Sequence, residues 1–284
     1  MLSRSSLLLS TTMAIASVCV ITTAAGQSSQ PRDQSSQAFG RSSNAWCADM
    51  SWDDRPSYCE VREERLPAVN PLEIDARPNG GIRVRGSDRG DALIRARIGG
   101  SADTRAAARS LVSGVRIVTL GASVHVEGPA RSDDQNWQVS FELEVPRSAL
   151  LTLTTTNGGI RVDDFHGGAK LHARNGGVRL SHVNGDISGE TTNGGITVDL
   201  DGDRWDGAGL DLRTTNGGIR ILIPRDYSAA LDIATTHGRV NVDFPITIQG
   251  TISQISRRLE TVIGAGGAKI AAVTTNGGVT IHQK

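Results

Sequence analysis

Thr-Thr-Asn-Gly-Gly followed by Ile or Val stands at residues 155–160, 191–196, 214–219 and 274–279. Asn-Gly-Gly without the preceding threonines occurs again at 79–81 and 175–177, and a variant, His-Gly-Arg, stands at 237–239. A fixed internal repeat is the mark of an architecture that stacks copies of one small unit. The repeat therefore predicts the fold before any single residue is given a role.

Apolar residues spaced two apart recur in phase with this motif from residue 151 onward. Each pair is followed nine residues later by another, as Leu151/Leu153 is followed by Ile160/Val162. Because alternate residues of a strand face the same side, each pair marks a short strand with one buried face. Two strands and two turns make an 18-residue unit, and its phase survives insertions at 201–209 and 243–268.

Two short strands cannot bury their apolar residues alone, but stacked units enclose a continuous core between two parallel ladders. The sequence thus predicts an all-β fold, a single-chain β-solenoid or β-helix of about six 18-residue coils over residues 151–284. A meander of hairpins is the alternative, because Asn-Gly also makes two-residue hairpin turns. The insertions favour the solenoid, since stacked coils tolerate outward loops.

Asparagine is expected at the corners of the coils because Asn-Gly reaches positive φ easily. The residues assigned to these structural turns are Asn157, Asn175, Asn193, Asn216 and Asn276.

Residues 67–150 are predicted to form an N-terminal β region with one helix. The helix is expected over 102–113, where alanine and arginine favour it, with Ser101 or Asp103 as its cap and Gly114 at its end. Strands are expected at 72–74, 82–84, 92–98, 115–120, 122–127 and 137–145.

Residues 1–26 have the features of a secretion signal: Arg4, a largely apolar stretch, then the small residues Ala24-Ala25-Gly26. Cys19 follows Val18, which is too large for a lipoprotein processing site, so lipidation is disfavoured. Residues 27–44 are polar and without period, which predicts a flexible linker. We therefore expect an exported protein of the periplasm or cell surface, with no transmembrane segment in the mature chain.

Removal of the signal takes away Arg4 and Cys19 and leaves Cys47 and Cys59. The 30 basic and 30 acidic residues then become 29 and 30, a net charge of −1, so a nucleic-acid partner is not expected. Two cysteines in an exported protein predict a disulfide, here within a stapled cap at 45–66. A two-cysteine metal site is the alternative, but it lacks a nearby histidine.

The Thr-Thr-Asn-Gly-Gly-Ile repeats resemble those of the bacterial putative-adhesin family, a family of domains of unknown function, and the head domains of putative auto-transporter adhesins. The resemblance covers about residues 60–284 and includes the Cys47…Cys59 pair, Pro78-Asn79-Gly80-Gly81 and Asp203-Arg204-Trp205. It implies an exported β-solenoid with an adhesive role and supplies no catalytic residues. The sequence ends at residues 281–284 without a barrel, sorting tail or hydrophobic anchor, so an auto-transporter mechanism is not expected.

The repeat phase places one column of side chains outward on successive coils: Arg161, Arg179, Thr197, Arg220, Arg239 and Thr280. Stacked arginines repel one another unless they are paired or bound to an anion. Asp163 and Asp199 lie two residues further along the same face and are candidates for pairing. The column is thus either a salt-bridged solvated face or a binding strip, whose arginines are Arg161, Arg179, Arg220 and Arg239.

Other candidate chemistry is weaker. Asp199, Asp201 and Asp203 begin like a calcium loop, but Arg204 stands where the turn glycine belongs. Asp163, Asp164 and His166 cluster at a turn, where carboxylates commonly cap the backbone. The remaining candidates are a second outward column and three scattered histidines: Thr156, Arg174, Thr192, Thr215, Thr236 and Thr275, with His172, His182 and His237.

The threonine column has mixed neighbours, unlike the paired columns of ice-binding solenoids, so cross-strand packing is the simpler interpretation. No nucleophile elbow, Walker loop or dinucleotide fingerprint occurs in the sequence. We therefore assign no catalytic residue, metal or cofactor.

The sequence predicts a non-enzymatic, adhesin-like solenoid that binds an anionic glycan, a surface polymer or an envelope protein. The first alternative is a structural or envelope-stress-linked module without a ligand of its own. The second is a carbohydrate-active β-helix enzyme.

Overall fold

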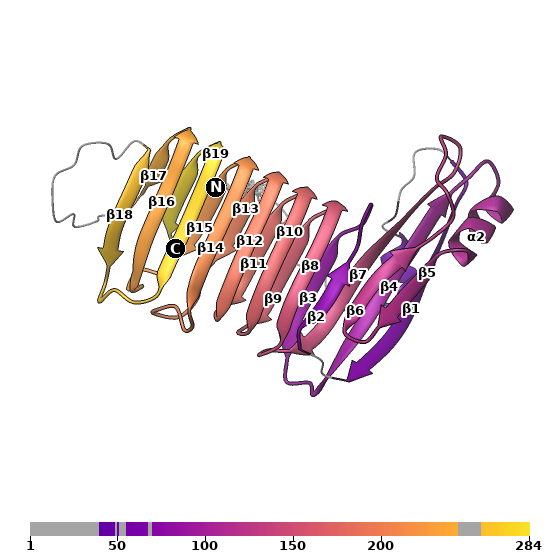
Figure 1. Ribbon diagram of the computed structural model, residues 1–284, viewed down its shortest axis with the longest axis horizontal. Coiled ribbons are helices and arrows are strands. Elements are labelled where there is room, and N and C mark those ends of the chain that lie inside the picture. Colours follow the sequence, from indigo (N-terminus) through magenta and orange to yellow (C-terminus); the bar gives the residue numbers. More distant parts are fainter. Residues whose placement is uncertain (1–39, 49, 51–54, 68–69, 244–256) are drawn as a thin grey trace, which may run out of the picture. The chain divides into compact units, whose positions relative to one another are not determined.

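The computed structural model describes residues 40–48, 50, 55–67, 70–243 and 257–284. The expected signal peptide, and the expected linker up to residue 39, lie outside these residues. The described chain is mostly β-structure, arranged in two ten-stranded sheets (Figure 1). The predicted all-β fold is confirmed.

Both sheets contain strands from the whole length of the described chain. Sheet A runs in the order β1 (Ser57–Pro67), β4 (Asp91–Ser101), β7 (Asn136–Pro146), β3 (Ile82–Ser87), β9 (Ile160–Phe165), β11 (Val178–Val183), β13 (Ile196–Asp199), β15 (Ile219–Ile223), β20 (Val279–Gln283) and β17 (Val240–Val242). Sheet B runs in the order β18 (Arg258–Ile263), β16 (Ala229–His237), β19 (Lys269–Asn276), β14 (Gly209–Asn216), β12 (Asp186–Asn193), β10 (Gly168–Asn175), β8 (Leu150–Asn157), β2 (Leu72–Asp75), β6 (Ser123–Glu127) and β5 (Arg116–Leu120).

Each coil contributes one strand to each sheet, joined by an Asn-Gly-Gly corner or its His-Gly-Arg variant. Strand β8 lies in sheet B and β9 in sheet A, and each pairs in parallel with its counterpart in the next coil. Parallel pairing across coils, rather than hairpins within them, excludes the meander. The predicted apolar pairs, such as Leu151/Leu153, are buried in one hydrophobic core between the sheets.

The stack of coils extends beyond residue 151 in the N-terminal direction. Strands β2 and β3, joined by the corner at 79–81, pair in parallel with β8 and β9. Part of the predicted N-terminal β region is therefore another coil of the same stack. Its corner is bound to the next, since Gly80 N donates to Asn157 O at 3.0 Å.

Chain order and spatial order differ at the other end of the stack. The last coil, β19 and β20, lies between the coil of β14 and β15 and that of β16 and β17. In Figure 1 the yellow strand β19 lies between the orange strands β16 and β14. Strand β18 then pairs antiparallel with β16 and forms the edge of sheet B.

The glycines of the corners are required by close approach between coils. An alanine Cβ at Gly176 would lie 2.0 Å from Gly158 O, and one at Gly194 would lie 2.2 Å from Gly176 O. The expectation that these corners use positive φ is wrong for the five asparagines, and the first glycine has positive φ only at Gly80. The backbones of adjacent corners are so close that a side chain at the first glycine of one corner would collide with the backbone of the adjacent corner.

Side chains also bind successive corners together. Each corner asparagine from Asn157 through Asn276 donates from Nδ2 to Oδ1 of the asparagine in a neighbouring coil, at 2.7 to 2.9 Å, and Asn79 accepts the first of these bonds. The first threonine of each motif is buried and donates to a glycine carbonyl of the neighbouring corner, as Thr191 does to Gly176 O at 2.7 Å. The motif thus combines lateral hydrogen bonds with close packing.

The Cys47–Cys59 disulfide is present, with a Cα–Cα distance of 5.7 Å. It joins α1 (Ser43–Ala48) to β1, an 11-residue strand that pairs antiparallel with β4. The predicted cap at 45–66 is therefore largely a regular edge strand of sheet A. Helix α1 begins at Ser43, within the last two residues of the predicted linker at 27–44.

The one predicted helix is α2 (Arg105–Ser113), which ends at Gly114 as expected. Its cap is Thr104, whose Oγ1 accepts a hydrogen bond from Ala107 N at 3.1 Å. The predicted caps are wrong, because Ser101 is the last residue of β4 and Asp103 precedes the true cap. Contact with β1 and β4 holds the helix at this end of sheet A.

Candidate functional site

One row of side chains crosses the outer face of sheet A at a single register position. We call it the cross-sheet row, and its members, from β1 to β17, are Glu63, Arg95, Glu142, Arg83, Arg161, Arg179, Thr197, Arg220, Thr280 and Asn241. Because each strand contributes one residue, neighbouring members are about 4.8 Å apart at the backbone. Apart from Arg239, the outward column predicted from the repeat is part of this row.

At the N-terminal end of the row, the charged side chains form ion pairs with one another. Arg95 bonds Glu63 at 2.8 Å and Glu142 at 3.0 Å, and Glu142 also bonds Arg83 at 3.2 Å. The Glu142 side chain is 1% exposed and that of Arg95 is 8% exposed, so these charges are buried in mutual contact. A buried carboxylate needs such partners, because removal from water penalises an unpaired charge.

Helix α1 covers this paired end. The Trp46 ring lies 5.2 Å from the guanidinium carbons of both Arg95 and Arg97. Arg97 donates to Trp46 O at 2.9 Å, and Arg95 donates to Arg41 O at 2.7 Å. The disulfide thus anchors a segment that closes one end of the row.

The row becomes exposed and unpaired further along. Arg161 bonds Asp163 at 2.6 Å, as the sequence suggested. Arg179 and Arg220 are exposed, and their side chains form no hydrogen bond or ion pair with any residue that the structure describes. Asp199, the other expected partner, instead bonds Lys284 Nζ at 2.6 Å. Two positive charges therefore face solvent with Thr197 between them.

Arg239 does not belong to the row, which corrects the sequence prediction. Val240 pairs with Val279 and Asn241 with Thr280, so Asn241 takes the outward position. Arg239 stands one residue earlier, where the other corners have their second glycine, and its carbonyl accepts from Val279 N at 3.0 Å. The variant corner His-Gly-Arg aligns residue for residue with Asn-Gly-Gly.

The acidic and histidine clusters do not assemble into one site. Asp163 pairs with Arg161, whereas Asp164 lies 3.3 Å from Arg85 and 3.4 Å from His182. Asp164 and His182 have positive φ, at 55° and 52°, in neighbouring coils. Within the residues that the structure describes, no group of three or more His, Cys, Asp or Glu side chains is placed to hold a metal ion.

The outer face of sheet B carries charges of a different kind. Arg213 bonds Asp211 at 2.9 Å, and Arg258 bonds Asp232 at 3.0 Å. Arg174 is exposed in the predicted threonine column. This face has arginines without the ordered row of sheet A, so it provides matched control positions.

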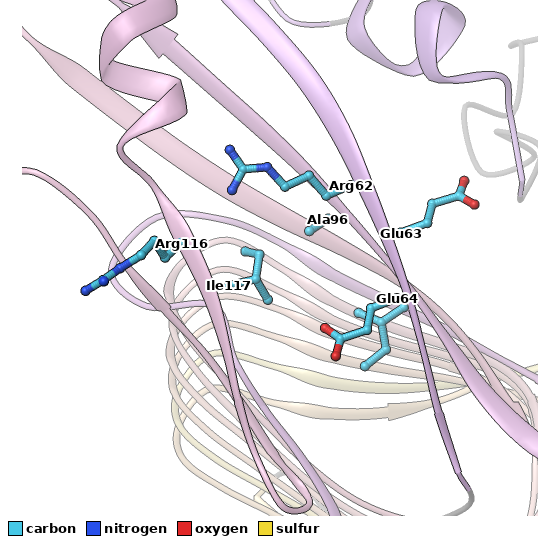
Figure 2. A pocket seen from close by; sticks show the side chains of 7 residues that line it. Arg62, Glu63, Glu64, Ala96, Arg116 and Ile117 are labelled. Carbon is cyan, nitrogen blue, oxygen red and sulfur yellow. The ribbon is translucent and has the colours of Figure 1, made fainter.

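A cavity of about 390 Å³ lies between β1 and β4 of sheet A and β5 of sheet B (Figure 2). Its lining is Arg62, Glu63, Glu64, Ile94, Ala96, Arg116 and Ile117. Arg62 donates to the Val112 and Val115 carbonyls at the end of α2. The other charged side chains that line the cavity, Glu63, Glu64 and Arg116, also bond protein groups. Figure 2 shows Glu63 turned away from Arg62 and Ile117. The charged groups around the cavity are therefore already engaged by protein partners, and the unpaired charges of the cross-sheet row are the better site.

Comparison with known proteins finds one family match and several similar solved structures. The family model described as Toastrack DUF4097 matches residues 133–282. A putative cell adhesion protein from Clostridium sporogenes is 9% identical, with 79% of this chain and 100% of that chain covered and a TM-score of 0.40. A putative adhesin from Bacteroides fragilis is 11% identical, with 79% and 97% covered and a TM-score of 0.32.

A putative lipid binding protein from Parabacteroides distasonis is 11% identical, with 80% of this chain and 96% of that chain covered and a TM-score of 0.30. No curated protein matches the chain. Among the described residues, no helix has both the length and the apolar character needed to cross a membrane.

Proposed function

This chain belongs to the Toastrack DUF4097 family, and we propose that it is an exported, non-enzymatic, adhesin-like solenoid whose sheet A binds an anionic polymer. The observation that carries the proposal is the pair Arg179 and Arg220, which are exposed and without partners among the described residues. Both project from parallel strands fixed by lateral hydrogen bonds at every corner. The strands that carry the two arginines are therefore fixed in position before any ligand binds.

Electrostatics supports an anion as the ligand. Unpaired guanidinium groups on alternate strands raise the local positive potential, and each binds carboxylate or sulfate through two parallel N–H donors. A polymer that meets several such groups gains from multivalency, because the second contact forms within one complex. The paired end of the row under α1 contributes rigidity rather than free charge.

Export is supported by the sequence features and the disulfide. The expected signal at 1–26 directs secretion, and a Cys47–Cys59 bridge is typical of proteins in oxidising compartments. We propose the periplasm or the cell surface as the location, where acidic glycans, surface polymers and envelope proteins are the available partners. No catalytic residue is assigned.

A face-exchange experiment tests the proposal. In one variant Arg161, Arg179 and Arg220 of sheet A are replaced by Ser, and in the control Arg174, Arg213 and Arg258 of sheet B are replaced by Ser. Both variants lose three positive charges, so net charge is matched. Retention on an immobilised anionic polysaccharide is measured along a salt gradient.

We expect the sheet A variant to elute at clearly lower salt than wild type and the sheet B variant to elute with wild type. Equal losses in both variants would show that the retention is general charge attraction. A wild-type protein that is retained on none of the acidic polysaccharides would instead support the module without a ligand.

A further inference from the structure

We infer that the preferred polymer is a polysaccharide with an acidic group on every second sugar, an inference that rests on the proposed function. It comes from the spatial order of the row, in which β20 is inserted between β15 and β17. In chain order Arg220 is followed by Asn241, but in space its neighbour is Thr280. The exposed part of the row therefore alternates.

The alternation covers four consecutive strands, β11, β13, β15 and β20. Their outward residues are Arg179, Thr197, Arg220 and Thr280. Charge, hydroxyl, charge and hydroxyl follow one another at one position of the register. With strands about 4.8 Å apart, the two arginines are about 9.6 Å apart at the backbone.

The positions beyond this segment do not offer further free charge. Arg161, on the next strand, is bonded to Asp163 at 2.6 Å, and Arg83 beyond it is bonded to Glu142 at 3.2 Å. On the other side Asn241 is neutral. The period of free positive charge is therefore two strands rather than one.

In a glycan that lies across the strands, successive sugars can contact successive members of the row. One pyranose with its linking oxygen spans roughly one strand spacing of about 4.8 Å, so successive sugars meet successive strands. Acidic groups on alternate sugars then face Arg179 and Arg220. Hydroxyls of the neutral sugars face Thr197 and Thr280, whose side chains both donate and accept.

A polymer with an acidic group on every sugar fits less well. Half of its carboxylates would face threonine hydroxyls, which offer no charge. The row thus selects for charge spacing as well as charge sign.

Two polysaccharide probes of matched length test the inference. Hyaluronate has a carboxylate on alternate sugars, and polygalacturonate has one on every sugar. For wild type at fixed salt we expect the dissociation constant to be lower for hyaluronate by about tenfold, or about 1.4 kcal/mol. The variant Thr197→Arg completes the charged row and is expected to remove or reverse this preference.

The control Thr192→Arg adds the same charge on the outer face of sheet B and is expected to keep the wild-type preference. Thr280→Arg repeats the test at the second hydroxyl, should Thr197→Arg fail to give the wild-type circular dichroism spectrum. Equal affinity of wild type for both probes, with both lost in the Arg161/Arg179/Arg220 variant, would overturn the spacing inference and leave the proposed function standing. If wild type binds neither probe, both the spacing inference and the proposed function are overturned. If Thr197→Arg and Thr192→Arg have identical effects, only the spacing inference is overturned.

Discussion

Alanine substitution of two adjacent glycines gives a sharp test of how the coils pack. An alanine Cβ at Gly194 would lie 2.2 Å from Gly176 O, whereas one at Gly195 would lie 3.3 Å from its nearest neighbour, Gly218 O. The two variants have the same composition and lie in the same corner. Only Gly194→Ala forces neighbouring corners apart.

The cost can be worked from the contacts at this corner. Separation of the corners weakens the Thr191 hydrogen bond to Gly176 O, at 2.7 Å, and the Gly176 N bond to Asn193 O, at 3.0 Å. Two bonds at about 1 kcal/mol each, with about 1 to 3 kcal/mol for overpacking, give a loss of about 3 to 5 kcal/mol. For Gly195→Ala we expect about 1 kcal/mol or less, because ordinary φ values accept alanine and the unfolded chain loses entropy.

Equilibrium unfolding in urea, followed by far-ultraviolet circular dichroism, measures the difference. We expect a much lower midpoint for Gly194→Ala than for Gly195→Ala. Gly90→Ala is the control, since no atom lies within 4 Å of its added Cβ, and it should match wild type. Equal midpoints for the two corner variants would refute close approach as the reason for the first glycine.

Three further predictions follow from the lateral bonds, the disulfide and an acid-sensitive contact. Thr214→Val removes the donor to Gly194 O and should lower the unfolding free energy by about 1 to 2 kcal/mol. Ala173→Thr supplies the missing hydroxyl at the Asn175 corner and should raise the unfolding free energy by about 1 kcal/mol. Urea midpoints that move the other way would contradict the role of this bond. Replacing both Cys47 and Cys59 by Ser should lower the unfolding free energy by about 3 kcal/mol on the chain-entropy model, and an unchanged midpoint would count against it. The hydrogen bond from His282, with a second from Gln283 N, lowers the pKa of Asp243 below its ordinary value of 3.8. The stabilising contribution of Asp243 is therefore complete above pH 3.8 and is lost as pH falls through the lower pKa of the folded state. Asp243→Asn should make the thermal midpoint less dependent on pH over this acid range, and an unaltered pH profile would refute the assignment.

The repeat predicted the local structure well because its cause is local. Apolar residues two apart have to share a face, so Leu151/Leu153 and Ile160/Val162 are buried as expected. The reason for the glycines was not accessible, because the collision involves a carbonyl of another coil. Close approach between coils and positive φ both select glycine, and the sequence alone does not separate them.

Spatial order was the larger gap. Stacked units of similar sequence are nearly interchangeable in their pairing, so nothing in the repeat shows that β19 and β20 lie between earlier coils. This order is what places Thr280 beside Arg220. The partners at the other end of the row were also hidden, since Arg95 and Glu142 are 47 residues apart. Charged residues within the apolar strands at 92–98 and 137–145 are the signal that could have found them.

The candidate site was predicted in part. Arg161, Arg179 and Arg220 lie on one face as the phase required, and Arg239 does not, because the variant corner shifts it into a glycine position. Which arginines are free depends on long-range pairing. Asp199 bonds Lys284, 85 residues away, and so leaves the row with two unpaired charges.

The most direct test of the account is the salt needed to elute the two triple variants from immobilised hyaluronate. We expect the Arg161/Arg179/Arg220 variant to elute at much lower salt than wild type, and the Arg174/Arg213/Arg258 variant to elute with wild type. If both variants elute together, at whatever salt, the cross-sheet row is not the binding surface.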